Sequence, residues 1–284
     1  MNTYRLITLA LACLASAIGL SAQDGENALI KVSYSHRFHA VDNSTKDPVM
    51  LSDTLVLVAG QTKSVFLNPL LEERSSAYFK RNRARANKIT VQSSMAPVPY
   101  ESIRKLIPDA TDYEEADFGC IEQIHKDRAS MHIENCLMFG EYLRNGQDAL
   151  ELSSWKTEDG EMKILGYDCR KASVVFGGRQ YYAWYTLDIP VSDGPWKLMG
   201  LPGLILKAED ADGMFCYEAI GLEKAEGTVP EPDESFETCS RKDYLRASKK
   251  NRTDIKMVFI HKGRLYISSI QPYSYTEQET DSKE

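Results

Sequence analysis

Four aspartates lie close together along the chain, and paired carboxylates are the groups with which many hydrolases carry out acid–base catalysis. They are Asp188, Asp193, Asp210 and Asp212. A general acid and a general base need a particular separation in space, which spacing along the sequence does not fix. Aspartate is also common in turns, where its side chain accepts backbone hydrogen bonds. A hydrolase that uses these carboxylates is therefore an alternative hypothesis, and we assign no catalytic residue.

Two cysteines and two histidines form a second cluster of residues that could do chemistry, and both types are common zinc ligands. They are Cys120, His125, His132 and Cys136. Their spacing does not match that of a zinc finger or zinc ribbon. The sequence also has no Gly-x-Ser-x-Gly, His-Glu-x-x-His or Walker motif. We therefore predict no metal site and no cofactor.

The cysteines are expected to be structural. Five of them remain if the first 22 residues are removed, so at least one thiol has no partner within the chain. The sequence contains no Cys-x-x-Cys pair, the spacing that would suggest a redox role. Two candidate disulfides are Cys120 with Cys136 and Cys169 with Cys216, although the sequence does not determine the connectivity.

A strand predicted over residues 179–187 carries aromatic residues on both faces. Tyr181 and Tyr185 share one face, and Tyr182 and Trp184 share the other. A sheet with one wet face should not carry aromatics on both. Either a second layer covers Tyr182 and Trp184, which we favour, or these side chains line a binding pocket.

The loop after this strand contains Gly194-Pro195 and Pro202-Gly203, dipeptides that suit tight turns. They flank Trp196-Lys197-Leu198-Met199, an apolar run that we expect to be exposed on a loop. The sequence therefore predicts a surface that binds a ligand or partner, consisting of Tyr182, Trp184, Pro195, Trp196, Leu201 and Pro202.

Most of the chain shows short apolar alternation typical of strands, interrupted by turn residues. A hairpin is predicted over residues 54–67 around Gly60-Gln61, a second over residues 255–270, and further strands that include residues 150–155. Helical spacing occurs at residues 70–88 and 240–251. The sequence predicts a mainly β or β-dominated α+β protein, an antiparallel curved sheet or open half-barrel with one or two helices. A β-sandwich is the alternative.

The N-terminus indicates export. Arg5 precedes an apolar run from Leu6 to Leu20, which predicts a signal peptide over residues 1–22. A single β-rich domain is expected over residues 23–270 and a polar, disordered tail over residues 271–284. The net charge is −7, and −8 without Arg5, which disfavours a nucleic-acid partner. No later segment is long and apolar enough to predict a transmembrane span.

The central stretch resembles a known family. Gly200-Leu201-Pro202-Gly203-Leu204-Ile205 has the six letters that name the GLPGLI family of exported Bacteroidetes envelope proteins. The segments Gly166–Ala172, Gly178–Thr186 and Ile189–Pro195 are also similar to that family's pattern. The resemblance implies export, a Gram-negative envelope setting and a β-rich fold. It assigns no activity and no catalytic residue.

These observations favour an exported protein of the periplasm or outer membrane with a non-enzymatic role. Such a protein would bind an apolar ligand or assist an outer-membrane or secreted partner protein. The alternatives are the hydrolase above, in an envelope setting, and a structural or scaffold protein without a ligand.

Overall fold

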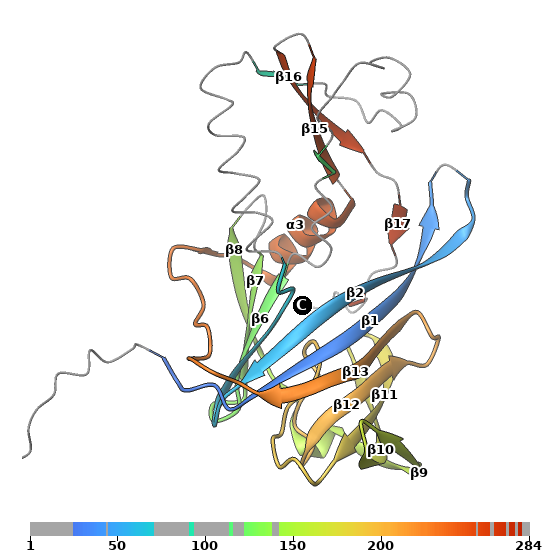
Figure 1. Cartoon of the computed structure of the whole chain (residues 1–284), viewed down its shortest axis with the longest axis vertical. Helices are drawn as coiled ribbons and strands as arrows, with labels where there is room; N and C mark the ends of the chain where they lie inside the picture. The colour runs from blue at the N-terminus through green and yellow to red at the C-terminus, as the bar shows by residue number, and fades with distance from the viewer. Residues whose placement is uncertain are drawn as a thin grey trace, which may run out of the picture.

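A computed structural model describes most of the chain (Figure 1). The described residues are 25–43, 45–70, 91–93, 114–115, 122–137, 142–253, 255–261, 264–270, 273–275 and 278–279. The predicted signal peptide lies outside them, and so does the helix predicted over residues 70–88, apart from Leu70.

One 13-stranded sheet dominates the fold, and twelve of its strands form a continuous path in the order β14-β8-β7-β6-β3-β2-β1-β13-β12-β11-β10-β9. Neighbours are antiparallel except for β14 and β8, and β17 pairs with β1 beside this path. The strands of the path and β17 are β1 (Ile30–Asp42), β2 (Pro48–Ala59), β3 (Lys63–Leu67), β6 (Glu122–Asp127), β7 (His132–Leu137), β8 (Leu143–Asp148), β9 (Lys156–Ile164), β10 (Tyr167–Phe176), β11 (Arg179–Thr186), β12 (Leu204–Asp210), β13 (Phe215–Lys224), β14 (Glu237–Thr238) and β17 (Tyr273–Tyr275).

A second sheet of four strands has the order β4-β16-β15-β5. Its strands are β4 (Val91–Ser93), β5 (Glu114–Glu115), β15 (Ile255–His261) and β16 (Arg264–Ile270). The pair β15–β16 is the hairpin predicted near the C-terminus, and β2–β3 is the hairpin predicted around Gly60.

The described helices are η1 (Leu152–Ser154), a short 3₁₀ helix, and α3 (Arg241–Thr253). Ser240 caps α3 because its hydroxyl accepts a hydrogen bond from the Asp243 amide and donates one to the Asp243 carboxylate. The helix predicted over residues 240–251 is therefore confirmed. The strand predicted over residues 150–155 is wrong, because η1 turns the chain there so that Trp155 can reach the core.

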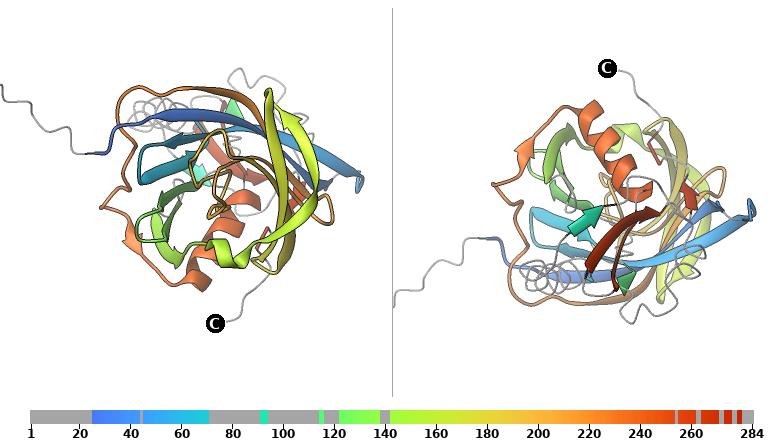
Figure 2. Two further views of the ribbon diagram at one scale, coloured as in Figure 1. Left: turned by 90° about the horizontal axis from the view of Figure 1, so that it is seen from below. Right: turned by 90° about the horizontal axis from the view of Figure 1, so that it is seen from above.

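Seen end-on, the large sheet curves into an open ring, and α3 lies at its opening (Figure 2). Among the described residues the fold is thus mainly β, with one large, curved, mostly antiparallel open sheet, a smaller four-stranded sheet and one short α-helix. The mainly β class and the curved antiparallel sheet are as predicted. The largest buried residues of the core include Tyr34, Tyr181 and Tyr217, which come from three different strands of the ring. Closing a sheet onto one core in this way buries alternate residues of each strand.

The loop between β11 and β12 fills much of this core. Leu198 and Met199 are fully buried, and Leu201 is 2% exposed. The indole nitrogen of Trp155 donates a hydrogen bond to the Met199 carbonyl at 2.9 Å. An apolar loop that satisfies its backbone in this way can be buried at low cost.

Two glycines of the Gly-Leu-Pro-Gly-Leu-Ile motif permit this packing. Gly200 has a φ of +96°, and a Cβ there would lie 2.2 Å from the Leu150 carbonyl oxygen. A Cβ on Gly203 would lie 1.9 Å from the Thr186 carbonyl oxygen. No other residue type fits either position, so the described geometry accounts for the motif through packing.

Candidate functional site

The six residues predicted to bind a ligand or partner do not form one surface. Trp196 and Leu201 belong to the core, Pro195 is buried near them, and Pro202 is exposed. Tyr182 is half-buried and Trp184 is 7% exposed. The expectation that the run from Trp196 to Met199 is exposed is wrong, because this loop folds back into the ring.

Two lysines cover the aromatic face formed by Tyr182 and Trp184. The Lys171 Nζ lies 4.3 Å from the ring centre of Tyr182 and 5.3 Å from that of Trp184. The Lys207 Nζ lies 4.9 Å from the same Trp184 ring centre and also pairs with Glu209. Long lysine side chains can cover apolar surface while their charged ends stay at the edge. These lysines lie on β10 and β12, the strands on either side of β11, so side chains of the same sheet cover this face and the described residues provide no separate second layer there.

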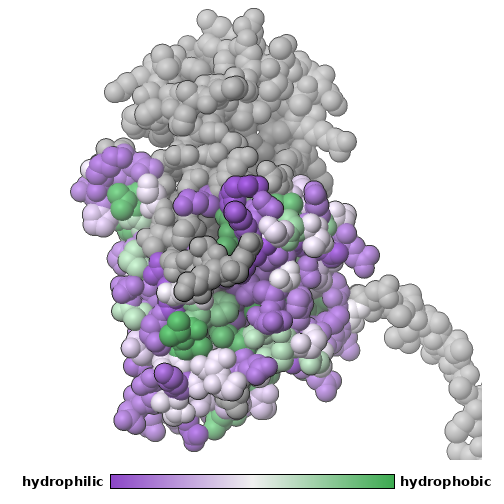
Figure 3. Space-filling model, turned by 180° about the vertical axis from the view of Figure 1, so that it is seen from behind, coloured by the Kyte–Doolittle hydropathy of each residue, from purple (hydrophilic) through white to green (hydrophobic). Residues whose placement is uncertain are grey.

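The exposed large apolar residues lie elsewhere and are spread over many elements. On the face seen in Figure 3, most of the described surface is hydrophilic. Single exposed apolar residues are normal on protein surfaces and need no ligand to explain them. They are Leu29, Val41, Met50, Leu70, Tyr142, Met162, Leu165, Val175, Leu187 and Ile220.

Asp193 is the centre of a buried ionic cluster that ties the β11–β12 loop to the opposite wall of the ring. Its carboxylate contacts the Lys126 ammonium at 2.5 Å and the Arg128 guanidinium at 2.5 Å. The Ser64 hydroxyl donates a further hydrogen bond to the same carboxylate at 2.5 Å. The Lys126 ammonium also reaches the Gly194 carbonyl at 2.6 Å.

The electrostatics of this cluster indicate a structural role. Burial by itself would raise the pKa of Asp193, but Lys126, Arg128 and the hydrogen bonds reverse this, so the pKa is lowered. A carboxylate that is ionised and fully engaged has neither a proton to give nor a free lone pair for a substrate.

The other three aspartates do not converge on Asp193. Asp210 is 3% exposed, pairs with Arg179 at 3.2 Å and accepts a hydrogen bond from the Phe215 amide. Asp188 and Asp212 are exposed. Asp210 and Asp212 both contact the Arg179 guanidinium, at 3.2 and 3.8 Å, so this pair is engaged with a cation. No described cleft brings two free carboxylates of the central stretch together.

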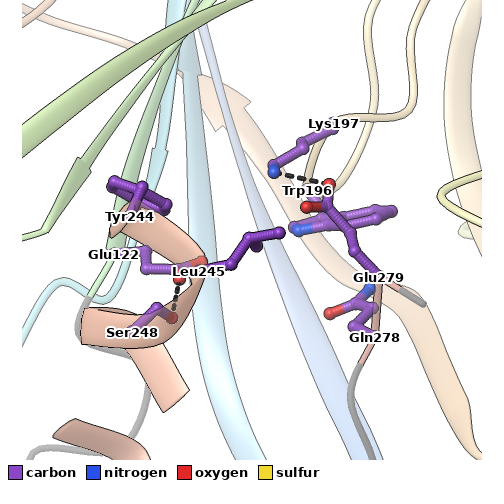
Figure 4. A pocket seen from close by; sticks show the side chains of 8 residues that line it. All are labelled: Glu122, Trp196, Lys197, Tyr244, Leu245, Ser248, Gln278 and Glu279. Atoms are coloured by element: carbon purple, nitrogen blue, oxygen red, sulfur yellow. Dashed lines mark hydrogen bonds and ion pairs between the residues drawn. The ribbon is translucent and has the colours of Figure 1, made fainter. Parts of the chain in front are cut away.

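A small polar pocket lies at the opening of the ring, with a cavity of about 20 Å³, room for about one water molecule. One wall comes from α3 and β6, and the other comes from the β11–β12 loop and the C-terminal segment (Figure 4). The pocket is lined by Glu122, Trp196, Lys197, Tyr244, Leu245, Ser248, Gln278 and Glu279.

A network of charged and amide groups holds Glu279 at this pocket. Its carboxylate contacts the Lys197 ammonium at 2.6 Å and the Arg241 guanidinium at 3.1 Å. The Gln147 side-chain oxygen accepts hydrogen bonds from Lys197, Arg241 and Asn135. We call Lys197, Arg241 and Gln147 the carboxylate cradle.

The Lys197 ammonium is the buried cation of this cradle, since its side chain is only 3% exposed. Burial lowers its pKa, and the neighbouring Glu279 and Glu122 carboxylates act in the opposite direction. A desolvated ammonium needs an opposite charge in contact, and Glu279 supplies it.

Gln278 is held as closely as Glu279. Its side-chain amide exchanges hydrogen bonds with the Tyr217 hydroxyl at 3.0–3.1 Å, and its carbonyl accepts one from the Tyr181 hydroxyl at 3.5 Å. Gln278 is 5% exposed and the Glu279 side chain is 5% exposed. Two described residues of the segment expected to be a disordered tail are thus packed against the core.

The histidine and cysteine cluster does not form a metal site among the residues that the structure describes. His125 is buried, its Nδ1 lies 3.1 Å from the Pro230 carbonyl, and burial lowers its pKa to about 4. A metal ligand set would need several such groups to converge.

The two candidate disulfides are not formed. Cys169 lies on β10 and Cys216 on β13, with β11 and β12 between them, and strand spacing of about 4.8 Å puts the two thiols far beyond bonding distance. Cys136 is a buried free thiol, and Cys120 lies outside the described residues. Burial raises the pKa of the Cys136 thiol to about 12, so it is unreactive.

The cradle is the part of the site that the sequence did not reveal. Lys197 lies within an apolar run, and Arg241 opens a basic helix. Glu279 is one of several acidic residues in a polar tail. The lysine in the midst of the buried run was the available signal, because a buried charge requires a partner.

Comparison with known proteins gives the fold and a partial family match. A family model described as "Protein of unknown function (Porph_ging)" matches residues 175–207, which contain the Gly-Leu-Pro-Gly-Leu-Ile motif. No curated protein matches the chain in sequence. No described helix is long and apolar enough to cross a membrane.

The fold is similar to part of a longer protein, PNGF-II. The C2 crystal form of PNGF-II aligns with a TM-score of 0.50 and 14% identity, covering 82% of this chain and 35% of PNGF-II. The P21 form aligns with a TM-score of 0.47 and 15% identity, covering 81% and 35%. The chain thus spans about a third of PNGF-II, and at this identity the likeness concerns the fold alone.

Proposed function

We propose that this chain is an exported, non-enzymatic protein of the bacterial envelope that assists an outer-membrane or secreted partner. It binds a segment of that partner at the opening of the ring. The main support for this proposal is the cradle of Lys197, Arg241 and Gln147, which holds the Glu279 carboxylate from a segment far away in the sequence.

The groups at this opening suit binding better than catalysis. The Lys197 ammonium and the Tyr181 and Tyr217 hydroxyls are fixed by burial, so they are preorganised to bind an extended polar segment. An apolar ligand is the less favoured version of the proposal, because Trp184, Trp196 and Leu201 are already packed.

The envelope setting rests on sequence. The predicted signal peptide over residues 1–22 supports export. The GLPGLI resemblance supports a Gram-negative envelope, and the Porph_ging family match over residues 175–207 agrees with a Bacteroidetes-type family. The scaffold hypothesis predicts that no partner is bound, and the hydrolase hypothesis lacks a pair of free carboxylates in a common cleft among the described residues.

The test is native mass spectrometry of protein isolated from the envelope fraction of its own host. Wild type should carry a reproducible extra polypeptide mass. Lys197→Met should lose it, because the partner's carboxylate loses its buried cation. Lys207→Met, which changes a lysine on the aromatic outer face, is the matched control and should retain it. A bare monomer in wild type would contradict the proposal.

A further inference from the structure

The C-terminal segment meets the cradle through contacts that resemble those of a bound ligand. Glu279 supplies the anion, Gln278 supplies a side-chain amide, and neither brings an apolar anchor into the core. Burying an ionised pair in this way is a weak source of stability, because desolvation offsets much of the attraction. A segment needed only to close the ring would be held more firmly by apolar side chains.

The wall opposite Glu279 is shaped for close approach of a main chain. A Cβ on Gly177, in the turn between β10 and β11, would lie 3.1 Å from the Glu279 Cγ and 3.4 Å from its Cα. The glycine therefore leaves the space that the glutamate occupies. This steric fit is independent of the ionic contacts and involves the main chain of the docked segment as well as its carboxylate.

From these contacts we propose that Gln278-Glu279 is an intramolecular ligand. It occupies a recognition site for an extended acidic peptide with glutamine followed by glutamate, and a partner with this chemistry displaces it. The inference rests on the proposed function, since the displaced segment marks the place where the partner binds.

The polar nature of the segment is what makes the exchange feasible. Release exposes Gln278 and Glu279 to water, where both are well solvated, so neither of these two side chains has apolar surface to hide. The Lys197 ammonium left behind is still largely desolvated by the surrounding chain, so it favours another carboxylate in contact. Tethering gives the chain's own tail a high effective concentration, and the partner must overcome this competition.

Charge selects the ligand. Lys197 and Arg241 are the two cations that face the bound carboxylate, and Glu122 is the acidic group that faces Lys197 from β6. The Glu122 carboxylate accepts a hydrogen bond from the Ser248 hydroxyl of α3. A peptide with one carboxylate at the Glu279 position is therefore accommodated, and a basic peptide is repelled.

The test is a titration of full-length protein with a synthetic peptide of residues 273–284, monitored by calorimetry and by tryptophan fluorescence, to which Trp196 in the pocket contributes. Wild type should bind the peptide weakly, because its own tail occupies the cradle. Glu279→Gln should bind it at least tenfold more tightly, since the competing carboxylate has been removed. Glu209→Gln, whose carboxylate pairs with Lys207 on the outer face, is the matched control and should behave as wild type.

Two further measurements make the result specific. The same peptide with glutamine at the Glu279 position should lose at least tenfold in affinity for Glu279→Gln protein. The double variant Lys197→Met, Glu279→Gln should lose the gain, with circular dichroism to show that it is folded. If it is not folded, Arg241→Gln with Glu279→Gln gives the same test from the rim of the cradle.

Equal affinity of wild type and Glu279→Gln for the peptide would overturn the proposal. If a partner is nevertheless found on wild type by native mass and lost in Lys197→Met, the proposed function stands and only the tail-displacement idea fails. If the peptide exchanges as expected but no partner is found, the site is confirmed as a peptide site and the envelope role fails.

Discussion

Replacing Asp193 by asparagine should destabilise the protein strongly. The substitution keeps the shape of the side chain but leaves the fully buried Lys126 ammonium and the nearly buried Arg128 guanidinium without their counter-charge. Removing one partner of a buried ion pair costs about 3–5 kcal/mol, because the remaining charge stays desolvated. For a chain of this size that lowers the melting temperature by roughly 5–8 °C.

The assay is urea unfolding followed by circular dichroism at pH 7, with Asp168→Asn as the matched control. Asp168 also pairs with a lysine, Lys163, but its side chain is 84% exposed, so its loss should cost less than about 1 kcal/mol. If the free energy of unfolding of Asp193→Asn lies within about 1 kcal/mol of the wild-type value, the cluster does not tie the loop to β3 and β6 as argued.

The same cluster should show itself in the pH dependence of stability. The pKa of Asp193 is lower in the fold than its ordinary value of 3.8. Its contribution is therefore fully present above about pH 4 and is lost as the pH falls through the folded-state pKa. The difference in unfolding free energy between wild type and Asp193→Asn should shrink below pH 4. A difference that stays constant down to pH 2 would contradict this reasoning.

Two more substitutions test the packing of the ring. Burial lowers the pKa of His125 from 6.5 to about 4, so the free energy of unfolding should fall by about 3 kcal/mol as the pH drops from 6.5 to 4. His125→Leu should flatten that slope in urea titrations, and an unchanged slope would contradict this account. Gly203→Ala puts a methyl group against the Thr186 carbonyl and should cost about 3 kcal/mol or more in thermal melts, whereas Gly221→Ala, with its nearest neighbour 3.8 Å away, should cost less than about 1 kcal/mol.

The strands and the helix over residues 240–251 were predictable because local patterns specify them. Alternation gives the strands, Gly60-Gln61 gives the β2–β3 turn, and Ser240 with Asp243 gives the start of α3. The sequence predicted that the sheet would be curved, but not the order of its strands. The strand predicted over residues 150–155 was wrong because a run this short has no periodicity that distinguishes a strand from a turn.

The candidate site was less predictable because it depends on contacts between distant segments. The aromatic residues Tyr182 and Trp184 suggested a pocket, but lysines from neighbouring strands cover them. The apolar loop around Trp196 suggested an exposed surface, but an open ring has an inside that such a loop can fill. Sequence spacing does not tell which lysine meets the Glu279 carboxylate.

The central claim is that the cradle around Lys197 binds a carboxylate of a partner in competition with Glu279. The most direct measurement is the amount of partner that co-purifies, by native mass spectrometry, with wild type, Glu279→Gln and Lys197→Met expressed at equal levels in the native host. The claim predicts the most partner on Glu279→Gln, less on wild type and none on Lys197→Met. Equal amounts on all three proteins would contradict it.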